Sequence, residues 1–151
     1  MEIPAHSRTV RVGNLLMGGG HPVVIQSMTN TDTLDTEATV AQCRRLFDSG
    51  CQLVRITAPG LKEARNLENI KDRLRQKGYD GPLCADIHFL PEAALVAAQI
   101  VEKVRINPGN YCDRKTGKTE FSQAEQEAER ERIGQRIAPL LETCREHGTA
   151  I

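Results

Sequence analysis

The most constraining feature of this chain is the placement of charged residues within three strand-like segments, 53–57, 83–88 and 103–107. Side chains alternate between the two faces of a strand, so each segment has one polar face and one apolar face. A row of charges within an otherwise apolar strand must meet water, an opposite charge or a ligand. Two arginines and a histidine in these rows, Arg55, Arg105 and His88, favour an anion, above all phosphate, while Lys103 lies deeper on the same face.

Strand-like segments alternate along the chain with segments whose apolar residues recur at helical spacing. We expect a β-hairpin that leads into a strand over residues 8–25, with Gly13 and Asn14 in the turn. Further strands are predicted at 23–28, 52–58, 82–87 and 103–107, and the start of a fifth at 149–151. Helices are predicted to begin near Asp35, residue 61, Pro91 and Ser122.

The alternation of strands and helices predicts a parallel sheet with right-handed crossovers. An open sheet with helices on both faces has apolar central strands, whereas a barrel turns one strand face into its lumen. The one-sided polar rows favour the barrel. We therefore predict an α/β fold, a partial TIM (β/α)8-type barrel of about four βα units. Residues 1–22 form an N-terminal extension and β-hairpin, and residues 23–151 form the first half of the barrel.

Composition excludes several classes of partner. Lys and Arg total 20, as do Asp and Glu, and aromatic residues are only 3%, so neither a general positive field nor base stacking favours nucleic acid. No apolar run approaches the roughly 20 residues that span a bilayer, so no membrane contact is expected. The N-terminus lacks a signal-peptide pattern, and the five cysteines contain no C-x-x-C pair, which is typical of a reducing cytoplasm.

Two other interpretations of the polar rows stay open. Arg55 and Asp86 are oppositely charged and on strand-like segments, so they could form a structural salt bridge inside the lumen. Asp86 and His88 share a strand face and could hold a divalent metal. No further His or carboxylate falls at the end of a predicted strand, so we favour hydrogen bonding to a substrate and expect no metal.

Four motifs, in this order and spacing, resemble the 4-hydroxy-3-methylbut-2-enyl diphosphate synthase family of the non-mevalonate isoprenoid pathway. They are Val-Ile-Gln-Ser-Met-Thr-Asn-Thr at 24–31, Leu-Val-Arg at 53–55, Ala-Asp-Ile-His-Phe at 85–89 and Val-Arg-Ile-Asn-Pro-Gly-Asn at 104–110. The resemblance runs from about Arg8 to the last residue. Each motif alone is weak, and the set is specific.

The resemblance implies an oxidoreductase whose TIM barrel binds the diphosphate of 2-C-methyl-D-erythritol 2,4-cyclodiphosphate. In this family a separate domain carries a [4Fe-4S] cluster on three cysteines and a glutamate, and flavodoxin or ferredoxin supplies two electrons. By the same resemblance Arg55, His88 and Arg105 contact the diphosphate. The remaining residues that it implicates line the pocket: Gln26, Met28, Asp86, Asn107 and Asn110.

The chain also departs from the family pattern. Its cysteines do not match the cluster ligands, so we expect the cluster, and every catalytic or metal-ligating group, to lie outside this chain. The long polar stretch 111–132 is typical of the three-domain subtype. We interpret the chain as a truncated, inactive piece whose open barrel edges favour a homodimer. The alternatives are another phosphate-binding barrel, such as a pteroate-synthase-like transferase, or an inert piece that only self-associates.

Overall fold

The computed structural model describes residues 7–108, 111 and 122–151, and its described parallel strands form one sheet. They are β3 (Gln26–Met28), β4 (Leu53–Thr57), β5 (Leu83–Ile87) and β6 (Lys103–Ile106). Their spatial order is β3-β4-β5-β6, so consecutive strands are neighbours. A doubly wound sheet reverses its strand order at a switch point, whereas a barrel wall does not. The fold is therefore α/β, as predicted, and its sheet is consistent with part of a TIM barrel.

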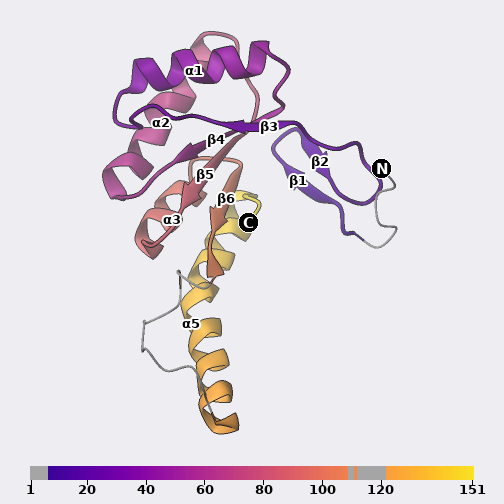
Figure 1. Ribbon diagram of the computed structural model, residues 1–151, viewed down its shortest axis with the longest axis vertical. Helices are drawn as coiled ribbons and strands as arrows, with labels where there is room; N and C mark the ends of the chain where they lie inside the picture. The colour runs from indigo at the N-terminus through magenta and orange to yellow at the C-terminus, as the bar shows by residue number, and fades with distance from the viewer. Residues whose placement is uncertain (1–6, 109–110, 112–121) are drawn as a thin grey trace.

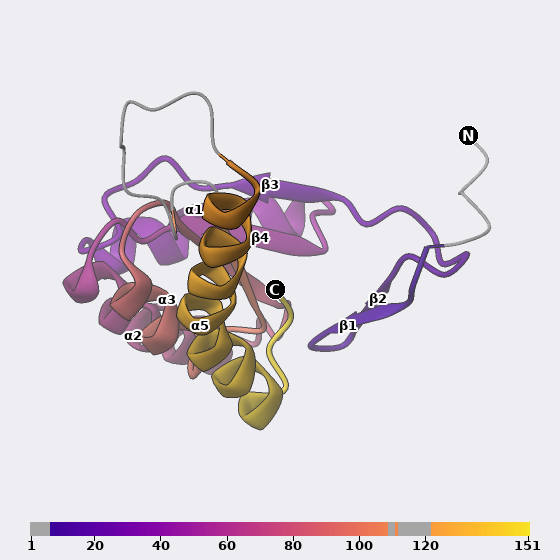
Figure 2. The ribbon, with the colours of Figure 1, turned by 90° about the horizontal axis from the view of Figure 1, so that it is seen from below.

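Helices cover one side of this sheet, and the N-terminal hairpin lies away from them (Figures 1 and 2). The described helices are α1 (Thr36–Asp48), α2 (Leu61–Gln76), α3 (Pro91–Ala98) and α5 (Gln123–His147). The sequence signals for their starts are confirmed in two cases by the capping contacts. The Asp35 carboxylate accepts a hydrogen bond from the Ala38 N–H, and Ser122 forms a reciprocal capping box with Glu125.

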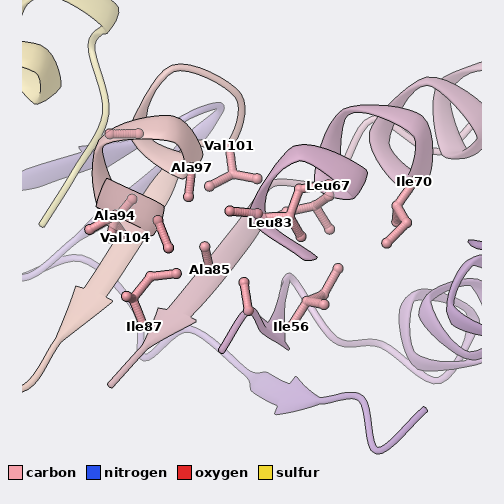
Figure 3. Packing of buried hydrophobic residues seen from close by; sticks show 14 of the residues in the cluster. Ile56, Leu67, Ile70, Leu83, Ala85, Ile87, Ala94, Ala97, Val101 and Val104 are labelled. Carbon is pink, nitrogen blue, oxygen red and sulfur yellow. The ribbon is translucent and has the colours of Figure 1, made fainter. Parts of the chain in front are cut away.

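The main hydrophobic core lies between the sheet and the helices (Figure 3). Its strand residues alternate with the polar rows, so they point to the helix side. Members from both layers have 0–1% of their surface exposed, and they include Val54, Ile56, Leu67, Ile70, Leu83, Ala85, Ile87 and Val104. Full burial of one such large apolar side chain contributes about 1.5–3 kcal/mol, so this core provides most of the driving force for folding.

The hairpin packs against the other face of the parallel sheet, at the amino ends of β4 and β5. Its strands β1 (Val10–Val12) and β2 (Leu15–Met17) are antiparallel, and Gly13 turns between them with φ 57°. Val12 packs with Leu53 and Cys84, which lie near the starts of β4 and β5. The predicted hairpin is thus confirmed, and it forms an apolar floor below the polar rows.

The last residues extend the sheet beyond β6. Ala150 forms a parallel bridge with Lys103, in which its N–H donates to the Glu102 carbonyl and its carbonyl accepts from the Val104 N–H. This bridge agrees with the predicted start of a fifth strand at 149–151. It also places that segment on the edge opposite β3, as successive strands of a barrel require.

The first parallel strand is shorter than predicted. The sequence predicts a strand over 23–28, whereas β3 begins at Gln26. Before that point the Ile25 N–H donates to the side chain of Gln52 rather than to a strand backbone. When a side chain accepts this hydrogen bond in place of a backbone carbonyl of the neighbouring strand, the backbone hydrogen-bond ladder between the two strands is interrupted. This interruption explains the shorter strand.

Glu102 fastens α2 to the amino ends of the central strands. Its carboxylate lies 2.9 Å from Lys71 Nζ and 3.2 Å from Arg75 Nη2, and it accepts a hydrogen bond from the Leu83 N–H. The side chain is 14% exposed. Glu102 is therefore a carboxylate with two cationic partners that lies at the end of the sheet opposite the polar strand ends.

Candidate anion-binding site

The strand register brings the polar rows together at the carboxyl ends of the central strands. Asp86 of β5 is level with Thr57 of β4 on one side and with Arg105 of β6 on the other. Arg55 lies two residues before Thr57 and therefore shares its face. In barrels of this kind the carboxyl ends of the strands form the active-site mouth.

One buried carboxylate holds three basic side chains. Arg55 Nη2 donates to Asp86 Oδ2 at 2.6 Å, and Arg105 Nη1 donates to Asp86 Oδ1 at 3.0 Å. His88 Nε2 lies 3.1 Å from Asp86 Oδ2. The side chain of Asp86 is only 2% exposed, whereas those of Arg55, His88 and Arg105 are 24%, 40% and 37% exposed. Solvent therefore reaches the three basic side chains but hardly reaches the carboxylate.

The guanidinium groups of Arg55 and Arg105 have more N–H donors than the Asp86 carboxylate accepts. Each uses one terminal nitrogen for Asp86, and the Nε atom of Arg55 is buried without a hydrogen-bond partner in the described part of the chain. Two permanent positive charges face one negative charge. Charge and hydrogen-bonding capacity are therefore both left for an anion, and Arg–phosphate pairs are strong charge-assisted contacts.

These contacts show that the Arg55–Asp86 salt bridge, left open by the sequence, does form. It does not stand alone, because Arg105 and His88 share the same carboxylate. A structural pair would balance its charges, and this network does not. The resemblance places Asp86 in the pocket wall, and in the structure its carboxylate is the buried centre of the network. The signal that could have found this role is that Asp86 is the only carboxylate in the three polar rows.

Burial raises the pKa of the Asp86 carboxyl, but the hydrogen bonds from Arg55 and His88, together with their charges, outweigh it. The pKa of Asp86 therefore lies below its ordinary value of 3.8. A carboxylate whose pKa is lower in the folded state stabilises that state at pH values above the pKa that it has in the unfolded chain. This contribution is lost as the pH falls through the pKa of the folded state.

We therefore expect the stability difference between this chain and its Asp86→Asn variant to depend on pH. The variant should be less stable at pH 7, and the gap should narrow below the unfolded value near 3.8 as the carboxylate takes up a proton. Urea denaturation of both proteins across this range measures the gap. Glu37→Gln is the control, since Glu37 is 66% exposed and 3.5 Å from Arg73, so its gap should stay small throughout. A gap for Asp86→Asn that does not change with pH would contradict the expectation.

The structure describes three of the four remaining residues that are predicted to line the pocket. Gln26 and Met28 lie on β3 in register with Leu53 and Arg55, so they share the face of the polar rows, and both are exposed. Asn107 follows β6 and is half-buried, and its carbonyl accepts from the Tyr111 N–H. Asn110 lies outside the described residues.

Two of the described cysteines, Cys43 and Cys84, are poor candidates for ligands of an iron–sulfur cluster. Burial raises the pKa of Cys43 to about 12 and that of Cys84 to about 11, although nearby Lys103 and Arg55 oppose the shift at Cys84. Cluster ligands are thiolates, and such pKa values disfavour that form. Within residues 7–108, 111 and 122–151, no group of three or more His, Cys, Asp or Glu side chains is arranged to hold a metal ion. Cys112 lies outside these residues.

A sheet of parallel βα units with basic side chains gathered at the strand carboxyl ends is typical of part of a TIM-barrel protein. Comparison with protein families gives the particular family. The chain matches the GcpE TIM-barrel domain over residues 7–151 and belongs to that family. None of its described helices is both long enough and apolar enough to cross a membrane.

Several relatives share the name 4-hydroxy-3-methylbut-2-en-1-yl diphosphate synthase (flavodoxin). The chain is 52% identical over 147 residues to the protein of that name from Phocaeicola vulgatus, and 52% identical over 147 residues to that from Parabacteroides distasonis. Both alignments cover 96% of this chain and 24% of the relative. The protein from Chlorobaculum tepidum is 41% identical over 146 residues, which cover 96% of this chain and 20% of the relative. The chain thus spans about a quarter of the length of these relatives.

Proposed function

We propose that this chain is the substrate-binding part of a 4-hydroxy-3-methylbut-2-enyl diphosphate synthase. The observation that carries the proposal is the convergence of Arg55, Arg105 and His88 on Asp86 at the carboxyl ends of the strands. The shared name of the relatives supports the same function, because its product is a diphosphate. The substrate is 2-C-methyl-D-erythritol 2,4-cyclodiphosphate.

The reaction opens the cyclic diphosphate by reduction. Two electrons and two protons are consumed. The carbon–oxygen bond of the ring and the bond from the neighbouring carbon to its hydroxyl are broken, a carbon–carbon double bond forms between these two carbons, and the hydroxyl oxygen leaves as water. A [4Fe-4S] cluster supplies the electron-transfer chemistry when bound, and its ligands belong to a part of the synthase outside this chain. The names of the relatives support flavodoxin as electron donor, with ferredoxin as the alternative. No catalytic or metal-ligating residue is assigned to this chain.

This chain's own residues bind and orient the substrate. Arg55 and Arg105 donate to diphosphate oxygens through the guanidinium nitrogens that Asp86 does not use, and His88 adds a third donor from the same strand end. The pocket wall is formed by residues on the same face and by two residues that follow β6 in the sequence, and they are Gln26, Met28, Asn107 and Asn110. Fixing the diphosphate holds the carbon skeleton in one orientation while the ring is reduced.

A chimaera tests the proposal. Residues 1–151 replace the matching segment of the Phocaeicola vulgatus relative, with which they share 52% identity. The purified and reconstituted chimaera should bind the cyclic diphosphate in calorimetry and convert it to the linear product with reduced flavodoxin. A folded chimaera that does neither would overturn the proposed function. Binding of a pterin in place of the cyclic diphosphate would favour a pteroate-synthase-like transferase.

We further propose that the chain by itself associates through its open edge. Among the described strands β3 pairs only with β4. Met28 of β3 is exposed, as are Val23 and Ile25 in the segment just before the strand. An unpaired edge next to exposed apolar residues favours pairing with a second copy. Light scattering should show dimers that Ile25→Lys weakens and that Leu141→Lys, on distant α5, leaves intact. A monodisperse monomer at all concentrations would contradict this expectation.

Two further assignments complete the proposal. We divide the chain into an N-terminal extension with the β-hairpin, residues 1–22, and the first half of a TIM barrel, residues 23–151. The separate floor made by the hairpin supports this boundary. We place the protein in the cytoplasm, without a nucleic-acid or membrane partner, which its balanced charge supports.

A further inference from the structure

We propose that Asp86 is a positioning residue that fixes the separation of the Arg55 and Arg105 guanidinium groups, and that this separation makes the site prefer a diphosphate over a single phosphate. The inference rests on the proposed function and adds the source of its selectivity. It begins with where the two arginines come from.

Arg55 and Arg105 stand on strands that are not neighbours. β5 lies between β4 and β6, and adjacent strands are about 4.8 Å apart. The backbones of the two arginines are therefore about 10 Å apart across the sheet, and they are also offset by two residues along the strands. Their guanidinium groups nevertheless meet at one carboxylate. Like charges repel one another, so the two groups converge only because Asp86 lies between them.

The carboxylate holds the two groups apart as well as together. Arg55 binds Oδ2 and Arg105 binds Oδ1, so each guanidinium occupies its own oxygen. The fixed geometry of the carboxylate thereby sets where the unused donors of each arginine lie. Two cationic forks at a fixed separation suit two phosphoryl groups joined through an oxygen, whereas one phosphate engages both forks less well.

Asp86 itself is not placed to touch the ligand. Its side chain is 2% exposed, both oxygens already accept hydrogen bonds, and a carboxylate repels an anion. These facts separate two roles that Asp86 could have. If it served only as a counter-charge, neutralising it would strengthen the binding of every anion. If it positions the arginines, neutralising it would remove the distinction between one phosphate and two.

The test uses the chimaera described above with inorganic pyrophosphate and orthophosphate as probes. Asp86→Asn keeps the shape of the side chain, but its amide offers one acceptor oxygen, so only one arginine stays held. We expect the ratio of pyrophosphate to orthophosphate affinity to fall by about tenfold, the factor that corresponds to one lost charge-assisted contact. Calorimetry with each anion at constant ionic strength measures the ratio.

Two further variants make the test specific. Glu102→Gln removes the charge of another carboxylate that holds two cationic side chains, at the opposite end of the sheet, and should leave the ratio unchanged. Asp86→Glu keeps the charge and both acceptors but moves them outward by one methylene, so its ratio should fall between those of the unsubstituted chimaera and Asp86→Asn. If Asp86→Asn does not fold, Asp86→Glu decides the matter. A folded Asp86 variant that keeps the original ratio, or that binds both anions more tightly by the same factor, would overturn the inference.

The outcomes also separate this inference from the function on which it rests. If the unsubstituted chimaera binds neither the cyclic diphosphate nor pyrophosphate, the proposed function fails. If the chimaera binds and converts its substrate while the Asp86 variants keep their selectivity, only the positioning role fails.

Discussion

Arg55→Ala and Arg105→Ala should each weaken the binding of the cyclic diphosphate to the chimaera by about a hundredfold. A hydrogen bond to a charged group contributes about 1.5–3 kcal/mol, and each arginine brings several donors to the site. Both side chains also remain partly exposed at the strand ends, so they are available to a ligand. Isothermal calorimetry measures the affinity, and circular dichroism checks that each variant is folded.

Arg44→Ala provides the matched control for this loss. Arg44 lies on α1, with its guanidinium 5.5 Å from the centre of the Tyr79 ring, outside the network around Asp86. Its removal changes the net charge by the same amount as either site variant. If all three variants bind the substrate equally well, the affinity does not come from the strand-end arginines, and the anion site is wrong.

The second large effect concerns the core. Leu67→Ala should lower the free energy of unfolding by about 2–5 kcal/mol, because it removes apolar surface and leaves a cavity between α2 and the sheet. Leu67 is 0% exposed and lies among the side chains of Figure 3. Domains of this size are stable by only about 5–15 kcal/mol, so the loss would remove a large share of the stability of the chain. Urea denaturation at pH 7 measures the change.

Leu141→Ala makes the same chemical deletion on another helix. Leu141 is 46% exposed on α5, so its truncation should change the free energy of unfolding by no more than about 0.5 kcal/mol. Because both substitutions replace leucine by alanine within a helix, their helix propensities cancel in the comparison. Equal effects of the two variants would show that the packing between α2 and the sheet does not dominate stability.

The strand faces and the helix starts could be predicted from the sequence because their signals are local. Alternation in 53–57 assigns Arg55 to one face and Ile56 to the other, and both lie as predicted. Asp35 and Ser122 mark helix starts through contacts with residues three positions away, so they too can be found in the sequence. Such features depend on a few neighbouring residues and on no tertiary contact.

The centre of the site was less predictable because it depends on register between strands. The sequence places Asp86 on the same face as the arginines but does not say that it is level with Arg105 on the next strand. One residue of slippage would turn the carboxylate to the opposite face. The short length of β3 was missed for a related reason, since it depends on the Gln52 side chain, whose contact with Ile25 spans 27 residues.

The apolar floor built by Val12, Leu53 and Cys84 has a consequence for ligand traffic. A β-barrel whose amino end is filled by apolar side chains admits ligands only from its carboxyl end. Under the proposed function, substrate and product would therefore both pass through the carboxyl end, and product would have to leave before the next substrate enters. Product release would then be a step that can limit turnover, independently of the rate of bond cleavage.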